Sequence, residues 1–124
     1  MEERITGTAD PCKVEKIRAI EALITADLTR SYSLKELSER FSISLTTMKR
    51  HFKNVYGSPI YSYLKQYRIH RAADLLLSHR ELKTSAIGTM VGYESHSKFT
   101  AVFHDVMGET PLVYRKRRIL EQQE

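Results

Sequence analysis

The stretch SPIYSYLKQYRIHRAADLLLS, residues 58–78, predicts a long helix around which the rest of the chain is organised. Ser58 can cap this helix, and Pro59 suits its first position, where no backbone N–H is needed. Apolar side chains recur at helical spacing through the stretch, at Ile60, Tyr63, Leu64, Tyr67, Ala72, Leu75 and Leu76. At about 1.5 Å per residue, a helix of roughly 20 residues is about 30 Å long.

The segments on either side of this helix resemble each other. LKELSERFSISLTTMKRHFKNVYG ends at Gly57, and SAIGTMVGYESHSKFTAVFHDVMG ends at Gly108. Three pairs match at an offset of 51 residues, namely Ser44 with Ser95, Met48 with Phe99, and Phe52 with Phe103. Upstream of Ser44 the offset falls to 50, so the second copy has one extra residue in its turn. The chain therefore contains two similar short units joined by one helix.

Each unit has the pattern of a helix-turn-helix motif. In the first, residues 41–44 form a turn, Ser44 caps a helix over 45–56, and Gly57 ends it. In the second, residues 92–94 form the turn, and Ser95 caps a helix that runs to about Met107. We expect the buried sides to be Leu45, Met48, Phe52 and Val55 or Tyr56 in the first helix, then Phe99, Val102, Phe103 and Val106 in the second. The outward sides are Thr46, Lys49, Arg50 and Lys53, then Ser97, Thr100, Ala101 and His104, with His96 and Lys98 beside them.

The remaining segments add helices and tails but no strands. Residues 1–12 are predicted to form a flexible tail or the remnant of a linker. A helix is expected over 13–29, started by Asp10 and Pro11, and a short helix capped by Ser33 follows to Arg40. A last short helix starts at Thr110 and Pro111 and ends in the basic run 115–118, after which 119–124 form a tail. No strand-like alternation of useful length appears, so the predicted fold class is all-α.

The basic charge of the chain is concentrated in one window. The net charge is +5, and no acid lies between Glu39 and Asp74. Arg40 opens this window, and the further bases in it are Lys49, Arg50, Lys53, Lys65, Arg68 and Arg71. The simplest interpretation of this acid-free window is a basic surface that faces solvent. An acid-free window that covers one repeat unit and the long helix favours a surface that faces a polyanion.

Several classes of protein are disfavoured by what the sequence lacks. No apolar run is long enough to span a membrane, and no secretory signal is visible. The single cysteine, Cys12, cannot form an internal disulfide, which fits a reducing cytoplasm. No two histidines are spaced i, i+4, and no Gly-rich phosphate loop or Ser/His/Asp arrangement is recognisable. We therefore expect no enzyme, no metal site and no cofactor.

Across residues 13–118 the chain resembles the DNA-binding domain of the AraC/XylS family of bacterial transcription regulators. The resemblance is most specific in the second unit, at Val91-Gly92-Tyr93, Ser95, Ser97, Phe99, Phe103, Gly108, Thr110-Pro111 and Tyr114-Arg115. Further matches are Ser44, Met48, Arg50, Phe52, Lys53 and Gly57 in the first unit, and Tyr63-Leu64, Arg68-Ile69 and Ala72 in the long helix. The resemblance implies seven helices in two homeodomain-like helix-turn-helix modules, 33–57 and 84–108, joined by the linker helix 58–78.

The resemblance also implies how the domain binds double-stranded DNA. The two reading helices would enter successive major grooves on one face of the duplex, and the predicted linker length is close to the groove repeat of about 34 Å. Base contacts carried over from the family are Thr46, Lys49 and Arg50, then His96, Ser97, Lys98 and Ala101. Phosphate candidates are Ser44, Thr47, Lys53, Arg68, Ser95 and Thr100. For Arg68 an equal alternative is that it braces the modules through a carboxylate.

This sequence departs from the family pattern at a few positions. Ser42 stands where the family usually has a turn glycine, and Gly88 replaces an alanine in the middle of a helix. Each is expected to weaken its unit, by about 0.5–1 kcal/mol for a mid-helix glycine. Ala101 sits where some relatives have an arginine, so the second module is expected to contact bases less than the first.

The wider function is also implied by the resemblance. It implies a cytoplasmic, nucleoid-associated activator with RNA polymerase as a partner, and a sensor domain preceding this one if the chain is part of a longer regulator. Two other functions remain open on the residues alone: a basic helical module that binds an acidic protein, and an RNA-binding module.

Overall fold

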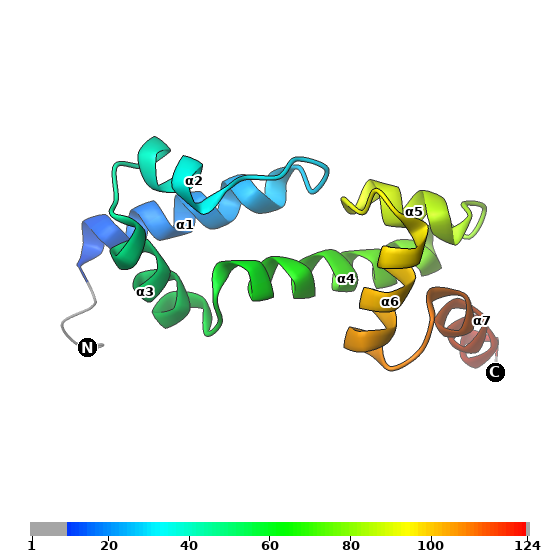
Figure 1. The fold of residues 1–124 in the computed structure, drawn as a ribbon. Helices are drawn as coiled ribbons and strands as arrows, with labels where there is room; N and C mark the ends of the chain where they lie inside the picture. Colours follow the sequence, from blue (N-terminus) through cyan, green and yellow to red (C-terminus); the bar gives the residue numbers. More distant parts are fainter. Residues whose placement is uncertain (1–9, 124) are drawn as a thin grey trace. The chain divides into compact units, whose positions relative to one another are not determined.

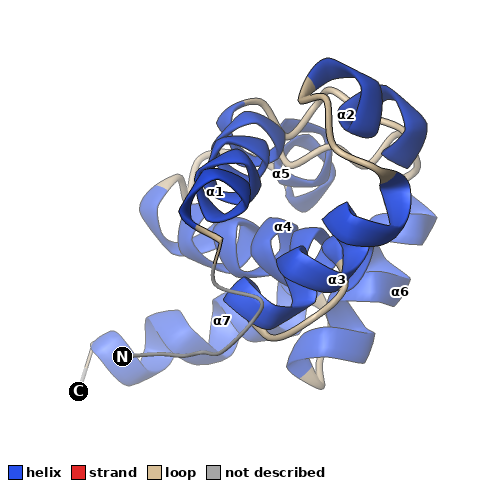
Figure 2. Cartoon of the chain, turned by 90° about the vertical axis from the view of Figure 1, so that its left-hand side faces the viewer, coloured by secondary structure: helices blue, strands red, loops and turns tan. Residues whose placement is uncertain are grey.

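A computed structural model describes residues 10–123, and every regular element within them is a helix (Figures 1 and 2). The helices are α1 (Pro11–Ala26), α2 (Leu34–Arg40), α3 (Leu45–Tyr56), α4 (Ile60–Ser78), α5 (Thr84–Met90), α6 (His96–Met107) and α7 (Pro111–Gln122). The all-α class and the seven predicted helices are confirmed. Among these helices, none combines the length and apolar character needed to cross a membrane. Most of the predicted N-terminal tail, residues 1–9, lies outside the described residues.

The chain divides into two compact units, residues 1–64 and 65–124. The boundary falls inside α4, which contributes its first residues to one unit and the rest to the other. In the first unit α1, α2 and α3 follow one another and lead through a short turn into α4 (Figure 1). In the second unit the remainder of α4 is followed by α5, α6 and α7. Each unit therefore contains one predicted helix-turn-helix motif.

The internal repeat is longer than the sequence indicated, because α1 is the counterpart of the second half of α4. At an offset of 52 residues, three pairs of fully or almost fully buried residues match: Ile17 with Ile69, Ile20 with Ala72, and Ile24 with Leu76. The two helices also end at matching positions, Ala26 and Ser78. The repeated element is thus a longer helix followed by the helix-turn-helix pair.

Helix α1 is shorter at its C-terminus than predicted. It was expected to reach Thr29 but ends at Ala26, with Asp27 as the cap residue. The Asp27 carboxylate accepts hydrogen bonds from the Thr29 backbone N–H, at 3.0 Å, and from the Thr29 hydroxyl. Such a local side-chain turn competes with continuation of the helix.

The core of the first unit is built on α1 and one side of α3. Its buried members are Ile17, Ile20, Ile24, Leu37, Ile43, Met48, Phe52 and Ile60. The Phe52 ring packs against Tyr56 and Tyr63, with centroids 4.8 and 5.4 Å away. The Tyr63 hydroxyl in turn donates to the Glu21 carboxylate at 2.6 Å. Burying these side chains fixes the orientation of α3 within the unit.

The buried side of α3 differs from the prediction at Leu45 and His51. Leu45, which was expected to be buried, is exposed, whereas His51 is buried. Of the two alternatives Val55 and Tyr56, Val55 is exposed and Tyr56 packs against the core. The Nδ1 atom of His51 lies 2.9 Å from the Thr47 carbonyl oxygen, so this nitrogen is paired within its own helix. The buried stripe therefore runs through Met48, His51 and Phe52, and Tyr56 at the end of the helix also packs against the core.

The second unit has an aromatic core of its own. Phe103 lies between Phe99 and Tyr114, with ring centroids at 5.8 and 5.5 Å. Tyr67, one of the residues that recur at helical spacing in α4, is exposed. Helix α7 continues to Gln122 and does not end at 118 as predicted. Its extra turn is supported by Arg117, which donates to Glu121 one turn further on at 2.7 Å.

Gly88 in α5 is required by the size of a neighbouring side chain. A Cβ atom at this position would lie 2.7 and 2.8 Å from two ring carbons of Phe99, closer than packed carbon atoms approach. The expectation that Gly88 only weakens its unit is therefore wrong. In the first unit the matching residues are Ser38 and Met48, so the second unit combines a smaller residue with a bulkier one.

We predict that Gly88→Ala lowers the free energy of unfolding by about 1 kcal/mol. Overpacking against Phe99 costs about 1–3 kcal/mol, which outweighs a gain in helix propensity of about 1 kcal/mol. Urea denaturation measures the change, and Thr89→Ala, at an exposed position of the same helix, serves as the control. In a double-mutant cycle Phe99→Leu should be less damaging in the Gly88→Ala background than in the native chain. Strictly additive effects would show that the two side chains do not compete for space.

Candidate functional site

Helix α3 presents its polar side to solvent. Its start is fixed by Ser44, whose hydroxyl accepts a hydrogen bond from the Thr47 N–H at 3.2 Å. Its end is fixed by Gly57, whose φ of 86° is a left-handed conformation that favours glycine. The predicted base-reading side chains of Thr46, Lys49 and Arg50 are all exposed, as is that of Lys53. Thr47, a phosphate candidate, is half-buried.

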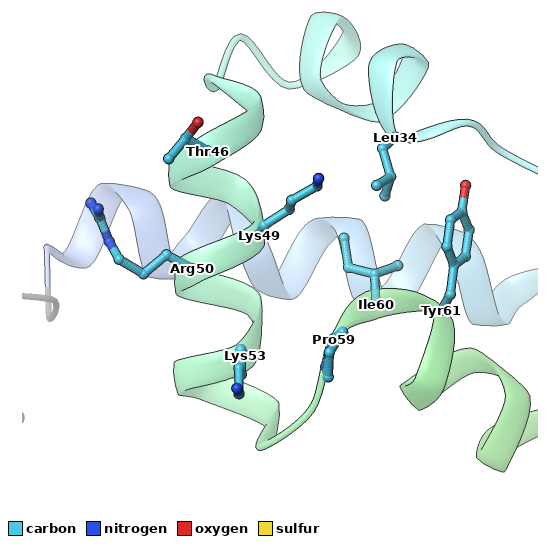
Figure 3. Close-up of a pocket in the computed structure, with 8 residues that line it drawn as sticks. All are labelled: Leu34, Thr46, Lys49, Arg50, Lys53, Pro59, Ile60 and Tyr61. Atoms are coloured by element: carbon cyan, nitrogen blue, oxygen red, sulfur yellow. The ribbon is translucent and has the colours of Figure 1, made fainter.

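The exposed side chains of α3 point in different directions (Figure 3). The Lys49 side chain extends toward Leu34 of α2, and that of Arg50 extends to the opposite side of the helix. Between α3, Leu34 and the first residues of α4 lies a groove of about 500 Å³. Thr46, Lys49, Arg50 and Lys53 line it together with Leu34, Pro59, Ile60 and Tyr61.

Helix α6 repeats the capping of α3 with fewer charges. The Ser95 hydroxyl accepts from the Lys98 N–H at 3.2 Å, and Gly108 ends the helix with φ of 84°. The predicted base-reading residues His96, Ser97, Lys98 and Ala101 are exposed, and Thr100 is half-buried. Lys98 is the only cation among these candidates. The exposed surface of α6 is therefore more neutral than that of α3.

Both turns are held by a cationic side chain from the preceding long helix. In the first unit Lys16 Nζ donates to the Ser42 carbonyl oxygen at 3.0 Å. In the second unit Arg68 Nη1 donates to the carbonyl oxygens of Gly92, at 3.0 Å, and Val91, at 3.2 Å. Lys16 and Arg68 are related by the offset of 52 that pairs α1 with α4. The shared role of Lys16 and Arg68 in holding the turns was not predicted from the sequence, although their matching positions in the repeat indicate it.

The turn residues themselves adopt left-handed conformations. Gly92 has φ of 100°, and Ser42 has φ of 52°, the one positive φ of a non-glycine residue in the described part of the chain. This conformation costs a residue with a Cβ atom about 1–2 kcal/mol. Ser42 therefore occupies a position that suits glycine.

The placement of Arg68 contradicts its assignment as a phosphate contact. Its side chain is only 9% exposed, and its guanidinium is directed at the turn and lies over the Tyr93 ring at 5.9 Å. Burial raises the pKa of Tyr93, and the Arg68 charge opposes that shift. Arg68 braces the second module through backbone carbonyls, and not through a carboxylate as the alternative supposed.

Much of the C-terminal basic run is also engaged within the second unit. Arg115 donates to the carbonyl oxygens of Leu76, His79 and Leu82, at 2.8, 3.1 and 2.7 Å, and so holds the end of α4 and the loop after it. Arg117 binds Glu109 with its closest N–O distance at 2.6 Å, and this hydrogen bonding holds the pKa of Glu109 below its usual range. These arginines act as structural clamps.

The chemistry available at the candidate surface is that of binding. Within residues 10–123, no three His, Cys, Asp or Glu side chains are grouped so that they could share a metal ion. The exposed surface of α3 supplies two ammonium groups, a guanidinium and hydroxyl donors, which suit phosphates and base edges.

Comparison with known proteins identifies a matching family model and similar curated proteins. A family model described as a helix-turn-helix domain matches residues 37–117. A curated relative named HTH-type transcriptional activator RhaR, from Enterobacter sp. (strain 638), is 33% identical over 114 residues, covering 90% of this chain and 40% of that protein. A relative from Streptomyces lividans, named as an AraC-like transcription regulator, is 30% identical over 112 residues, covering 90% of this chain and 35% of that protein. The chain thus spans two fifths or less of the length of these relatives.

A solved structure shares the fold. The DNA-binding domain of AdpA, solved in complex with a target DNA, superimposes with a TM-score of 0.80. The match covers 88% of this chain and 97% of that chain at 20% sequence identity. At this identity the similarity shows the fold alone.

We predict that Arg68→Met lowers the free energy of unfolding by about 1.5–3 kcal/mol, because it removes the charged donor from two acceptors and leaves them unpaired. Lys16→Met is the matched control in the other unit. Its contact is exposed and single, so the loss should stay below about 1 kcal/mol. Urea denaturation measures both changes. Equal losses for the two variants, or no loss for Arg68→Met, would contradict the bracing role.

Proposed function

This chain belongs to the AraC-type family of helix-turn-helix proteins, and from that premise we propose that it binds double-stranded DNA sequence-specifically and regulates transcription. The observation that carries the proposal is the pair of capped helices α3 and α6. Each buries an aromatic side in its own unit and leaves a polar side exposed. A helix held in this way can lie in a major groove with its polar side toward the base edges.

The proposed base-reading residues are the exposed side chains of the two helices. They are Thr46, Lys49 and Arg50 on α3, and His96, Ser97, Lys98 and Ala101 on α6. The proposed phosphate contacts are Ser44, Thr47, Lys53, Ser95 and Thr100, which lie at helix starts or beside the reading surface. Arg68 is excluded from this set because its guanidinium binds the turn. Ala101 can offer only an apolar contact, for example to a thymine methyl group.

We propose further that α3 and α6 read two successive major-groove segments. The repeat supports this proposal because each unit carries its own capped helix with an exposed polar side. The second module would discriminate less between base sequences than the first, because its proposed base-reading residues include only one cation. The domain would then have one strongly specified half-site and one weaker half-site.

The regulatory role is proposed from the relatives. RhaR is named as a transcriptional activator, so activation through contact with RNA polymerase is the proposed outcome of binding. Because the chain matches only part of that protein, an N-terminal sensor domain is a proposed partner in a longer regulator. The proposed location is the cytoplasm, at the nucleoid.

Two other functions remain as alternatives. A basic helical surface could bind RNA or an acidic protein, and the acid-free window 40–73 is compatible with either. Neither alternative accounts for two equivalent capped helices that each expose a polar side. Titration with duplex DNA, an RNA hairpin and an acidic peptide at physiological salt separates the three, and preference for the duplex is expected.

Binding to the duplex should weaken steeply as salt is raised. Each phosphate that the protein neutralises contributes about −0.9 to the slope of log K against log salt. Lys49, Lys53 and Lys98 would bring three cations close to the DNA phosphates. We therefore expect fluorescence anisotropy to give a negative slope with a magnitude of about 3 or more. A slope near zero would exclude the proposed interface, and Lys53→Ala should reduce its magnitude by about 1.

The modules should differ in how much sequence they specify. Arg50→Ala should relax the preferred sequence in one half of the site, because a guanidinium contact to guanine O6 and N7 is worth about 1–3 kcal/mol of discrimination. His96→Ala and Ser97→Ala should change the other half less, while Lys53→Ala should weaken all sequences similarly. Selection from a randomised duplex pool measures each effect. An unchanged preference for Arg50→Ala together with an altered one for Ser97→Ala would reverse the roles of the modules.

A further inference from the structure

The groove beside α3 has a chemistry that DNA binding alone does not explain. Its volume of about 500 Å³ falls within the range of small-molecule sites, and every residue that lines it belongs to the first unit. We call it the α3–α4 groove, lined by Leu34, Thr46, Lys49, Arg50, Lys53, Pro59, Ile60 and Tyr61.

One wall of the α3–α4 groove is apolar. Leu34 from α2 and Pro59, Ile60 and Tyr61 at the start of α4 lie across from α3 (Figure 3). Ile60 is buried in the core, whereas Tyr61 is 55% exposed. The Tyr61 hydroxyl reaches the Tyr32 carbonyl oxygen at 3.4 Å, which leaves its ring available as a side wall. A phosphate group gains little from such a wall, but an apolar ring gains by burial.

The opposite wall is cationic. Lys49, Arg50 and Lys53 line the groove from α3, and of these Lys49 points toward Leu34 while Arg50 points to the other side of the helix. None of the lining residues is acidic. The first residues of α4 also lie here, and the N-terminus of a helix carries a partial positive charge. The site therefore complements a negative group attached to an apolar body.

We propose that the α3–α4 groove binds an aryl carboxylate, a compact aromatic molecule with a single carboxylate. The ring packs against Leu34, Pro59 and Tyr61, and the carboxylate pairs with Lys49, which extends toward this side of α3. The same lysine is a proposed base reader, so the bound ligand displaces DNA from α3. This second consequence rests on the proposed function, and the binding itself does not.

The binding is tested by titrating the full chain with 2-naphthoate and recording ¹H–¹⁵N NMR spectra at each step. We expect saturable shifts centred on Leu34, Lys49 and Tyr61, and at least tenfold weaker binding of the uncharged 2-naphthamide. Tyr61→Ala should weaken 2-naphthoate at least fivefold. Its matched control is Tyr67→Ala, the same substitution on α4 at an exposed residue that does not line the groove, which should leave binding unchanged.

Equal affinity for the amide, shifts spread over lysines elsewhere, or equal effects of the two tyrosine variants would overturn the site. The Tyr61 substitution is at an exposed position, so an unchanged far-UV circular dichroism spectrum verifies that the variant is folded.

Competition with duplex DNA tests the second consequence separately. We expect 2-naphthoate to raise the apparent Kd for duplex at least fivefold in the native chain and less than twofold in Tyr61→Ala. Groove shifts without any loss of duplex binding would overturn the competition. Groove shifts in a chain that binds no duplex at any salt concentration would support the ligand site and overturn the proposed function.

Discussion

The burial of two phenylalanines, Phe52 in α3 and Phe103 in α6, decides which side of each helix faces solvent. Both are completely buried, and they occupy equivalent positions in the repeat. Because successive helical residues turn by about 100°, burying Phe52 places Arg50 almost opposite the core, and burying Phe103 does the same for Ala101. The identity of those two outward residues then gives α3 a cationic surface and α6 a more neutral one. The two modules therefore share the same packing and differ in the charge of the residues that this packing turns outward.

Equivalent turns are stabilised in unequal ways. Each has a residue in the left-handed region, and each receives a hydrogen bond from a cation on the longer helix that precedes the helix-turn-helix pair. Arg68 is buried and makes two such bonds, whereas Lys16 makes one from a more exposed position. Ser42 adds strain to the first turn that Gly92 avoids in the second. The module with the greater reading charge is therefore the one with the less firmly held turn.

The sequence predicted what depends on local spacing and missed what depends on distant backbone atoms. Ser44, Ser95, Gly57 and Gly108 were assigned correctly, because caps and helix ends have local signatures. The backbone contacts of Arg68 and Arg115 were not predicted, because their partners are carbonyl oxygens 23 to 39 residues away. The candidate readers on α3 and α6 were found to be exposed, but their contacts with bases stay a prediction. The α3–α4 groove needed the fold, since Leu34, Lys49 and Tyr61 come from three helices.

Guanine methylation interference on a selected duplex tests the central claim most directly. Methylation at N7 blocks only contacts made in the major groove, so it reports where α3 and α6 read the bases. The account predicts two interference clusters, centred about one helical turn apart on the same face of the duplex, with the stronger cluster weakened by Arg50→Ala. A single cluster that Arg50→Ala leaves unchanged would contradict two reading helices of unequal strength.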